Sequence, residues 1–218
     1  MRWNSLLDVV FPPQCAACNA IGSGLCRACT PPAEPITVRI PGLTVRAPGR
    51  YTGGVRAAIL AVKDGRRDVA ERLGRIVAPL IARGSLLIPV PTSALRRRVR
   101  GIDGVALIAR AAAIVAGAAV ETPLYLRRDD AQRGRSRPER LAARGRFGCV
   151  AEAVAGARVV LFDDVCTTGA TLRDCAAALR TAGAVVDDAI VAAVALPEAG
   201  GSDAATKCGG PWTPLPAP

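Results

Sequence analysis

The segment 159–171 restricts the fold of this chain more than any other part of its sequence. It reads Val-Val-Leu-Phe-Asp-Asp-Val-Cys-Thr-Thr-Gly-Ala-Thr. Its apolar start predicts a buried parallel strand over residues 158–163, with the acids Asp163 and Asp164 at the carboxyl end. A short turn follows, and residues 172–182 are expected to form a helix. A strand, a loop and a helix in this order predict a phosphate-binding site, because backbone N–H groups and the helix dipole attract an anion to a helix N-terminus.

The turn after the acids carries groups that suit a phosphate. Thr167, Thr168 and Thr171 offer hydroxyl donors, Gly169 permits a positive φ and a close backbone approach, and Ala170 completes the turn. Two carboxylates would repel a free phosphate, so we expect the acid pair to face another part of the same ligand, such as sugar hydroxyls or a metal ion. The alternative is an ordinary strand followed by an N-capped helix, with solvated acids. A dinucleotide site is less favoured, because no GxGxxG sequence follows any predicted strand.

Four cysteines near the N-terminus form a second pattern. Cys15, Cys18, Cys26 and Cys29 make two CxxC pairs separated by seven residues, a spacing typical of a tetrahedral all-sulfur site that favours Zn²⁺. Four protein ligands leave no position for a substrate, so the site is predicted to be structural and to supply folding energy to a segment too short for its own core. Iron–sulfur ligation uses the same sulfurs and stays open, whereas disulfides are less favoured because no secretory pattern is recognisable.

Composition narrows the chemistry further. The chain has 218 residues, of which 50% are hydrophobic and only 3% aromatic, so the core is expected to consist mostly of Ala, Val, Leu and Ile. It has no histidine, which excludes a histidine general base and histidine metal ligands. A net charge of +11 favours polyanionic partners such as nucleotides, pyrophosphate or nucleic acid. The alanine-rich stretch 105–120 is interrupted by Arg110 and predicts a buried helix, so we expect a cytoplasmic protein without membrane insertion.

The order of the predicted elements indicates an α/β fold with three parts. Residues 1–34 are expected to form the zinc-binding module and a linker, residues 35–197 the main domain, and residues 198–218 a disordered tail. Strands are predicted at 36–40, 43–47, 86–90, 120–126, 158–163 and 189–196, and helices at 54–62, 69–82, 104–117 and 172–182. Their alternation predicts a parallel sheet covered by helices on both faces. Pro89 argues against a central position for its strand.

Two arginine-rich segments are candidates for anion binding. One follows the Pro-Val-Pro end of the strand 86–90 and holds four arginines within residues 96–100, among them Arg98 and Arg100. The other, residues 127–147, holds eight arginines in a long polar stretch with little periodicity, which is typical of a mobile loop. For both segments, a solvated basic face is the alternative.

Taken in order, these segments resemble the ComF family, competence-associated proteins with an N-terminal zinc knuckle and a type I phosphoribosyltransferase domain. The resemblance covers roughly residues 5–196. The segment 159–171 itself resembles the motif with which type I phosphoribosyltransferases bind phosphoribosyl pyrophosphate (PRPP). The further matching residues are Lys63-Asp64-Gly65-Arg66-Arg67, Arg98, Arg100-Gly101, Gln132, Ser136, Glu139-Arg140 and Phe147. The chain departs from the family pattern at Asp103 and Ala143, where asparagine is common.

The resemblance implies roles for individual residues. Asp163 and Asp164 would hold the ribose hydroxyls, and residues 167–171 would hold the 5′-phosphate. Arg98 and Arg100 would contact the pyrophosphate, to which Mg²⁺ is bound. Asp163, Asp164 and Arg100 are the residues to which a catalytic contribution is assigned.

The implied activity is Mg²⁺-dependent phosphoribosyl transfer linked to DNA uptake or nucleotide metabolism, with the segment 127–147 closing over the site. A second hypothesis is a non-catalytic adaptor of DNA uptake that senses PRPP or a nucleotide, or that contacts single-stranded DNA or DNA-uptake proteins. A purely structural zinc scaffold is a third hypothesis, and it leaves the segment 159–171 unexplained.

Overall fold

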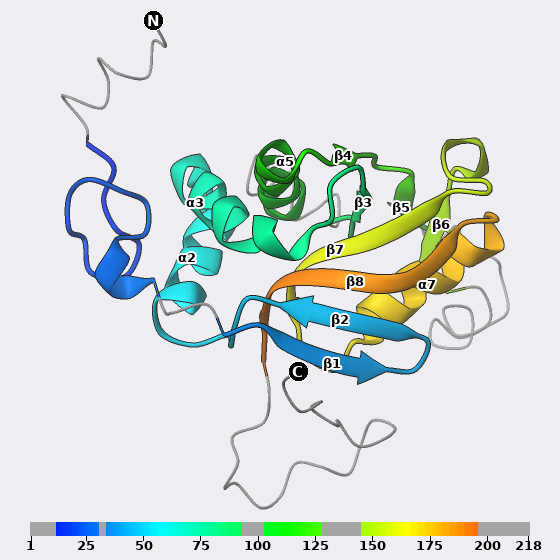
Figure 1. The fold of residues 1–218 in the computed structure, drawn as a ribbon, viewed down its shortest axis with the longest axis horizontal. Helices are drawn as coiled ribbons and strands as arrows, with labels where there is room; N and C mark the ends of the chain where they lie inside the picture. The colour runs from blue at the N-terminus through cyan, green and yellow to red at the C-terminus, as the bar shows by residue number, and fades with distance from the viewer. Residues whose placement is uncertain (1–11, 31–33, 93–102, 128–144, 196–218) are drawn as a thin grey trace, which may run out of the picture.

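A six-stranded sheet forms the centre of the molecule (Figure 1). The structure is a computed structural model, and it describes residues 12–30, 34–92, 103–127 and 145–195. Across the sheet lie β1 (Ile36–Ile40), β2 (Leu43–Ala47), β8 (Val185–Val194), β7 (Arg158–Cys166), β3 (Leu86–Pro89) and β4 (Ala119–Val120). Within this sheet β1 and β2 pair antiparallel, as the predicted hairpin, and the other neighbouring strands pair parallel. The carboxyl ends of β3 and β7 therefore meet at one edge of the sheet.

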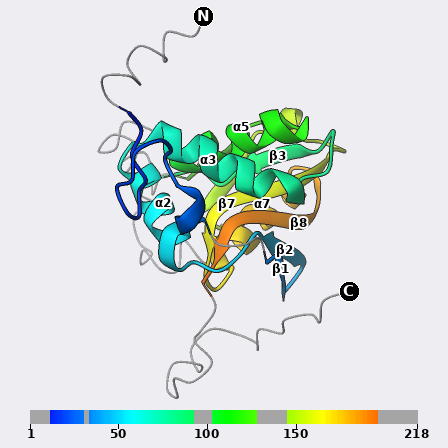
Figure 2. The same ribbon diagram turned by 60° about the vertical axis from the view of Figure 1, so that its left-hand side comes forward.

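Helices cover both faces of the sheet (Figures 1 and 2). One face carries α2 (Gly53–Lys63), α3 (Arg67–Val77) and α5 (Gly104–Ala116), and the other carries α7 (Ala170–Thr181) with the antiparallel pair β5 (Leu124–Leu126) and β6 (Phe147–Cys149). Short 3-10 turns lie at Arg27–Cys29, Ala78–Leu80 and Ala151–Ala153. Neighbouring residues of β7 point to opposite faces, since Leu161 is buried on the α7 side and Phe162 among the other helices. The predicted fold class, a mostly parallel α/β sheet flanked by helices, is confirmed.

The two long central strands extend further than the sequence predicts. β7 pairs with β8 as far as Cys166, so the acid pair lies inside the strand rather than beyond its end. β8 begins at Val185 instead of residue 189. Its start escaped prediction because Asp187 and Asp188 interrupt the apolar pattern there, and both form surface ion pairs with arginines.

Two other predicted elements are divided in the structure. The strand predicted over residues 120–126 is split into β4 and β5, which belong to different sheets. Pro123 lies between them and has no N–H to donate to a ladder. The helix predicted over residues 69–82 ends at Val77 and continues as a 3-10 turn that contains Pro79.

Pro89 is compatible with an internal strand, contrary to the prediction. β3 lies between β7 and β4. The N–H of Val90 donates to the carbonyl of Phe162 in β7 at 2.8 Å, so the nitrogen of Pro89 faces the opposite side, toward β4. β4 pairs only with Leu86 and Leu87. No ladder partner is therefore lost at Pro89.

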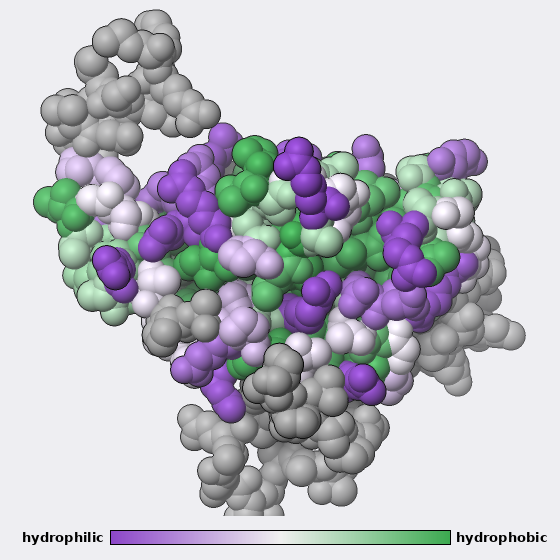
Figure 3. Space-filling view, viewed as in Figure 1, coloured by the Kyte–Doolittle hydropathy of each residue, from purple (hydrophilic) through white to green (hydrophobic). Residues whose placement is uncertain are grey.

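The helical layer presents a mixed surface. Ile114 and Val115 of α5 are 83% and 55% exposed, and Arg110 of the same helix is exposed too. Figure 3 shows hydrophobic and hydrophilic residues interspersed over this view of the molecule.

Among the residues that the structure describes, no helix has the length and apolar character needed to cross a membrane. The predicted tail, residues 198–218, lies outside the described residues.

Candidate ligand site and metal centre

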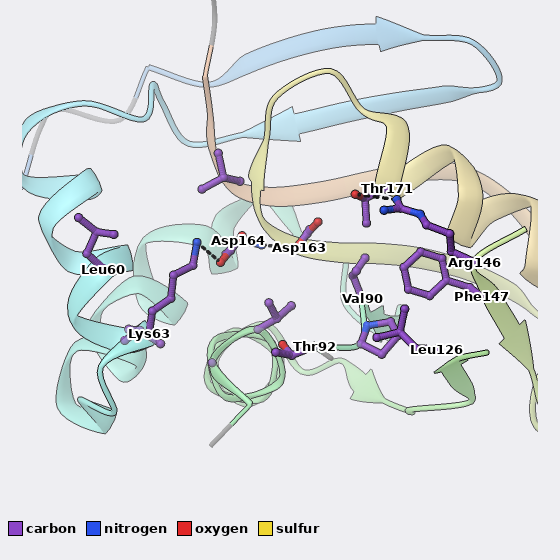
Figure 4. A pocket seen from close by; sticks show the side chains of 15 residues that line it. Leu60, Lys63, Val90, Thr92, Leu126, Arg146, Phe147, Asp163, Asp164 and Thr171 are labelled. Atoms are coloured by element: carbon purple, nitrogen blue, oxygen red, sulfur yellow. Dashed lines mark hydrogen bonds and ion pairs between the residues drawn. The ribbon is translucent and has the colours of Figure 1, made fainter. Parts of the chain in front are cut away.

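A cavity of about 680 Å³ opens at the carboxyl ends of β3 and β7 (Figure 4). Its walls combine the acid pair of β7 with Thr171 at the start of α7, Lys63 at the end of α2, and Arg146. These residues come from four separate parts of the chain. The parallel sheet brings them together, since the ends of its strands meet at one edge.

Asp163 is the most deeply buried acid of the site. Its side chain is 9% exposed, and its Oδ1 accepts the N–H of Asp164 at 2.8 Å. Burial and the neighbouring charge of Asp164 raise the pKa of Asp163 to about 8, although Lys63 and the N–H donor act in the opposite direction. Asp163 therefore retains its proton over much of the neutral range.

Asp164 has a cationic partner. Its Oδ2 lies 2.9 Å from the Nζ of Lys63, the last residue of α2, and the side chains are 18% and 30% exposed. Figure 4 shows Lys63 reaching across the cavity toward the acid pair. The sequence places Lys63 in a segment that resembles the ComF family, but it predicts no role for this residue. No local pattern links Lys63 to Asp164, which lies about a hundred positions further along the chain.

The turn between β7 and α7 has the geometry that its sequence predicts. Gly169 has a φ of 71°, and a Cβ on it would lie 2.6 Å from the Cδ1 of Ile40. Thr167 and Thr168 are exposed, and the Thr168 Oγ1 accepts the N–H of Ala170 at 3.4 Å. α7 begins at Ala170, two residues before its predicted start. The turn thus leads directly into a helix N-terminus beside the acid pair.

Arg146 is a second site residue that sequence reasoning missed as an individual contact. Its Nε donates to Asp174 Oδ2 at 2.9 Å, and its Nη2 donates to Thr171 Oγ1 at 3.3 Å. The guanidinium carbon lies 5.5 Å from the ring centre of Phe147. The sequence placed Arg146 only within a segment of eight arginines and offered no signal to distinguish it from the others.

Asp103 has a structural role. It is the N-cap of α5, where its Oδ1 accepts the N–H of Ala106 and the hydroxyl of Thr92, both at 3.2 Å. The predicted pyrophosphate residues Arg98 and Arg100 lie outside the described residues, as does the greater part of the predicted closing segment, residues 128–144.

The four N-terminal cysteines come together in a cluster. All four sulfurs lie within 4.8 Å of one another, and those of Cys18 and Cys26 are 3.7 Å apart. Tetrahedral bonds of about 2.3 Å to zinc place sulfurs roughly 3.8 Å apart, whereas a disulfide requires about 2.05 Å. The cysteines are free thiols. Their spacing is therefore compatible with a structural zinc ion.

Backbone groups favour a charged sulfur at Cys15. Burial acts to raise the pKa of this thiol, but the N–H groups of Cys26 and Ala17, at 3.4 and 3.5 Å from the sulfur, contribute to lowering it to about 6. A thiolate is the form that binds a metal ion. The neighbouring sulfurs raise the pKa of Cys29 to about 12, so a bound cation would be needed to balance the charge of four thiolates.

The cysteine cluster is packed against α2 and α3. Cys15 and Leu25 are fully buried in the same hydrophobic core as these helices. A Cβ on Gly54, at the start of α2, would lie only 2.0 Å from the carbonyl oxygen of Cys29. Arg66, just after α2, donates to the carbonyl of Gln14. Contacts near both ends of α2 therefore connect the helix to the cluster.

Several solved structures are similar to part of this chain. An allosteric regulatory enzyme of purine biosynthesis is 24% identical with a TM-score of 0.43, and the glutamine PRPP amidotransferase from B. subtilis, complexed with ADP and GMP, is 23% identical with a TM-score of 0.44. Each match covers 61% of this chain and 30% of the other. The orotate phosphoribosyltransferase from Aeropyrum pernix is 25% identical with a TM-score of 0.33, covering 56% of each chain. No family model and no curated protein sequence matches the chain.

Proposed function

We propose that the chain binds PRPP in the cavity beside β7 and transfers its phosphoribosyl group to an acceptor. The observation that carries the proposal is the meeting of the acid pair of β7 and Thr171, in the first turn of α7, at one cavity. Carboxylates accept hydrogen bonds from sugar hydroxyls, and a helix N-terminus binds a phosphate. A phosphoribosyl ligand presents both groups.

The proposed reaction breaks the bond between C1 of the ribose and the pyrophosphate oxygen, and the bonding electron pair leaves with the pyrophosphate. Positive charge develops at C1, and a nucleophilic atom of the acceptor then bonds to it. Asp163 and Asp164 orient the ribose and lie close to the developing positive charge. Arg98 and Arg100 are the proposed partners of the leaving pyrophosphate.

Magnesium is part of this proposal. The carboxylate oxygens of the acid pair are of the ligand type that Mg²⁺ prefers. When bound with PRPP, the ion would neutralise charge on the pyrophosphate. The contribution of the described residues is to bind and orient the sugar, while Lys63 limits the repulsion between Asp164 and an anionic ligand.

The double variant Asp163→Ala/Asp164→Ala tests the proposal by calorimetry with PRPP and with inorganic phosphate. Each charge-assisted hydrogen bond to a ribose hydroxyl contributes roughly 1.5–3 kcal/mol, so PRPP affinity is expected to fall by at least about tenfold. Inorganic phosphate should bind equally well or better, because its proposed partners remain and the negative charge of the acid pair is gone. Asp187→Ala/Asp188→Ala is a matched control, since this second Asp–Asp pair lies near the start of β8 and does not line the cavity.

Two results would contradict the proposal. One is unchanged PRPP affinity in the folded Asp163→Ala/Asp164→Ala variant. The other is an equal loss of PRPP and phosphate binding together with a lower melting temperature, which would indicate that the acids only stabilise the turn. Turnover is measured separately, as pyrophosphate released in the presence of candidate nucleobases.

The finer assignment, a ComF-type protein linked to DNA uptake or nucleotide metabolism, rests on the sequence resemblance. Its alternative is an adaptor that binds PRPP or a nucleotide without turnover. The net charge of +11 and the cysteine cluster favour that alternative. PRPP binding without pyrophosphate release, combined with salt-sensitive binding of single-stranded DNA, would support the adaptor. We propose zinc as the ion of the cysteine cluster in either case.

A further inference from the structure

Arg146 lies next to the first turn of α7, within reach of a phosphate bound at the N-terminus of this helix. Its guanidinium lies against the first turn of the helix, where it donates to Thr171 and to Asp174. It also lines the cavity that contains the acid pair. Figure 4 shows Arg146 beside Thr171, with the acid pair between it and Lys63. The cavity thus has a cation at each end, and Lys63 is the one already paired with a carboxylate of the acid pair.

The hydrogen bonds of Arg146 leave donors available. A guanidinium has five N–H donors and no acceptor. Among the described residues, its recorded hydrogen bonds use one donor on Nε and one on Nη2. Because Arg146 donates to the Thr171 oxygen, the hydroxyl hydrogen of Thr171 remains free to donate elsewhere. Arg146 and Thr171 therefore present N–H and O–H donors on the same side of the helix start.

Asp174 determines where the guanidinium lies. It follows Thr171 by three residues, so both side chains lie on one side of α7. The bond from Nε to Asp174 is the shorter of the two, at 2.9 Å against 3.3 Å. The side chains of Arg146 and Asp174 are 45% and 40% exposed, so a ligand can reach the guanidinium.

We propose that Arg146, positioned by Asp174, binds the terminal phosphate of the phosphoribosyl ligand and sets the preference for a 5′-phosphorylated over an unphosphorylated ribose. This inference rests on the proposed function. A phosphomonoester carries a charge near −2 at neutral pH, with a second pKa of about 6. The helix N-terminus supplies only about half a positive charge, and the acid pair opposes binding. Arg146 adds a positive charge at this position, which its ion pair with Asp174 offsets only in part because both side chains are partly exposed.

Calorimetric titration of ribose 5-phosphate, PRPP, ribose and inorganic phosphate tests the inference. Arg146→Ala should bind ribose 5-phosphate and PRPP at least about tenfold more weakly, and Arg146→Lys should recover part of the loss because it keeps the charge but not the planar fork. Arg158→Ala is the matched control, since Arg158 forms an exposed ion pair with Asp187 at the same 2.9 Å distance. It should bind all ligands like the wild type.

A pH series separates a ligand contact from a structural role. Wild-type affinity for ribose 5-phosphate should rise between pH 5.5 and 7.5 as the phosphate loses its second proton. Arg146→Ala should show a flatter rise. Asp174→Asn should weaken binding less than Arg146→Ala and flatten the rise partly, because the guanidinium keeps its charge but loses its orientation.

The outcomes distinguish this inference from the proposed function. If the wild type binds neither PRPP nor ribose 5-phosphate, the proposed function fails. If it binds both and Arg146→Ala binds them equally well, the inference alone is overturned. Inorganic phosphate gives a second contrast, since Arg146→Ala should weaken its binding and Asp163→Ala/Asp164→Ala should not. Should Arg146→Ala not fold, wild-type affinity and an unchanged pH profile in both Arg146→Lys and Asp174→Asn would overturn the inference.

Discussion

The cysteine cluster and the acid pair both concentrate groups of like charge, and the protein stabilises them in opposite ways. At the cysteine cluster, backbone N–H donors contribute to lowering the pKa of Cys15 to about 6 and so favour the thiolate. At the acid pair, burial and Asp164 raise the pKa of Asp163 to about 8, and Lys63 pairs with Asp164. The four sulfurs of the cluster are compatible with a bound cation, which would balance their charge. The acid pair has an internal cation and a retained proton, which suits a partner that comes and goes.

The helix α2 lies between these two regions. Its first turn touches the cysteine cluster through Gly54, and its last residue, Lys63, reaches the acid pair. Its 11 residues span about 16 Å at 1.5 Å per residue. Because α2 contacts both regions, we expect that loss of a metal ion from the cysteine cluster would shift α2 and thereby affect the ligand site.

Loss of a cysteine ligand should have the largest effect. Cys18 is exposed, so Cys18→Ser removes one sulfur with little change in packing. Elemental analysis should show one zinc per wild-type chain and far less in the variant. Structural zinc contributes roughly 10–16 kcal/mol in isolated zinc-binding peptides, so we expect residues 12–30 to become sensitive to protease and the melting temperature to fall.

The matched control is Cys149→Ser, which removes a thiol outside the cluster. Its metal content should equal that of the wild type. If the wild-type protein instead contains iron and absorbs visible light, the centre is an iron–sulfur cluster and not a zinc site. Wild-type protein without metal but with a protease-resistant N-terminal segment would contradict the assignment of a metal site.

The protonation of Asp163 should produce a smaller, pH-dependent effect. The native state keeps a proton on Asp163 that the unfolded state releases near its ordinary pKa of 3.8. Wild-type stability should therefore decline as pH rises from about 4 to about 8 and then level off. Asp163→Asn is neutral at all pH values and should not show this decline, so its melting temperature relative to the wild type should increase with pH. The exposed acid variant Asp187→Asn serves as the matched control, and a constant difference between Asp163→Asn and the wild type would refute the raised pKa.

Local patterns in the sequence predict the parts of the structure that depend on consecutive residues. The strand, turn and helix around residues 159–171 were recognisable because apolar run, acid pair and hydroxyl-rich turn follow one another directly. The cysteine cluster was recognisable because four ligands recur within fifteen residues. Backbone periodicity and turn chemistry determine such features, so they can be read without knowing what packs against them.

Contacts between distant segments were not predictable from local patterns. Lys63 and Asp164 belong to elements a hundred residues apart, and their meeting depends on how α2 packs on the sheet. Arg146 is one of many arginines, and its position beside the cavity depends on its contact with Asp174, one turn into α7. The tolerance of Pro89 in an internal strand also depends on its neighbour, because β4 ends before reaching it. Strand register and helix packing determine these features, and the sequence of a single segment determines neither of them.

Removal of the Lys63 charge should give the smallest effect and test the link between the two regions. The ion pair is partly exposed, so Lys63→Met should lower the unfolding free energy by only about 1 kcal/mol, as measured by urea unfolding at pH 7.5. Lys63→Arg retains the charge and should recover most of the loss. Since Lys63 acts to lower the pKa of Asp163, the pH-dependent decline in stability should extend to higher pH in Lys63→Met.

If α2 is held in place by the cysteine cluster, Lys63→Met should change stability less in a Cys18→Ser background, because the ion pair is already weakened there. Equal effects in both backgrounds would show that the metal centre and the acid pair are independent.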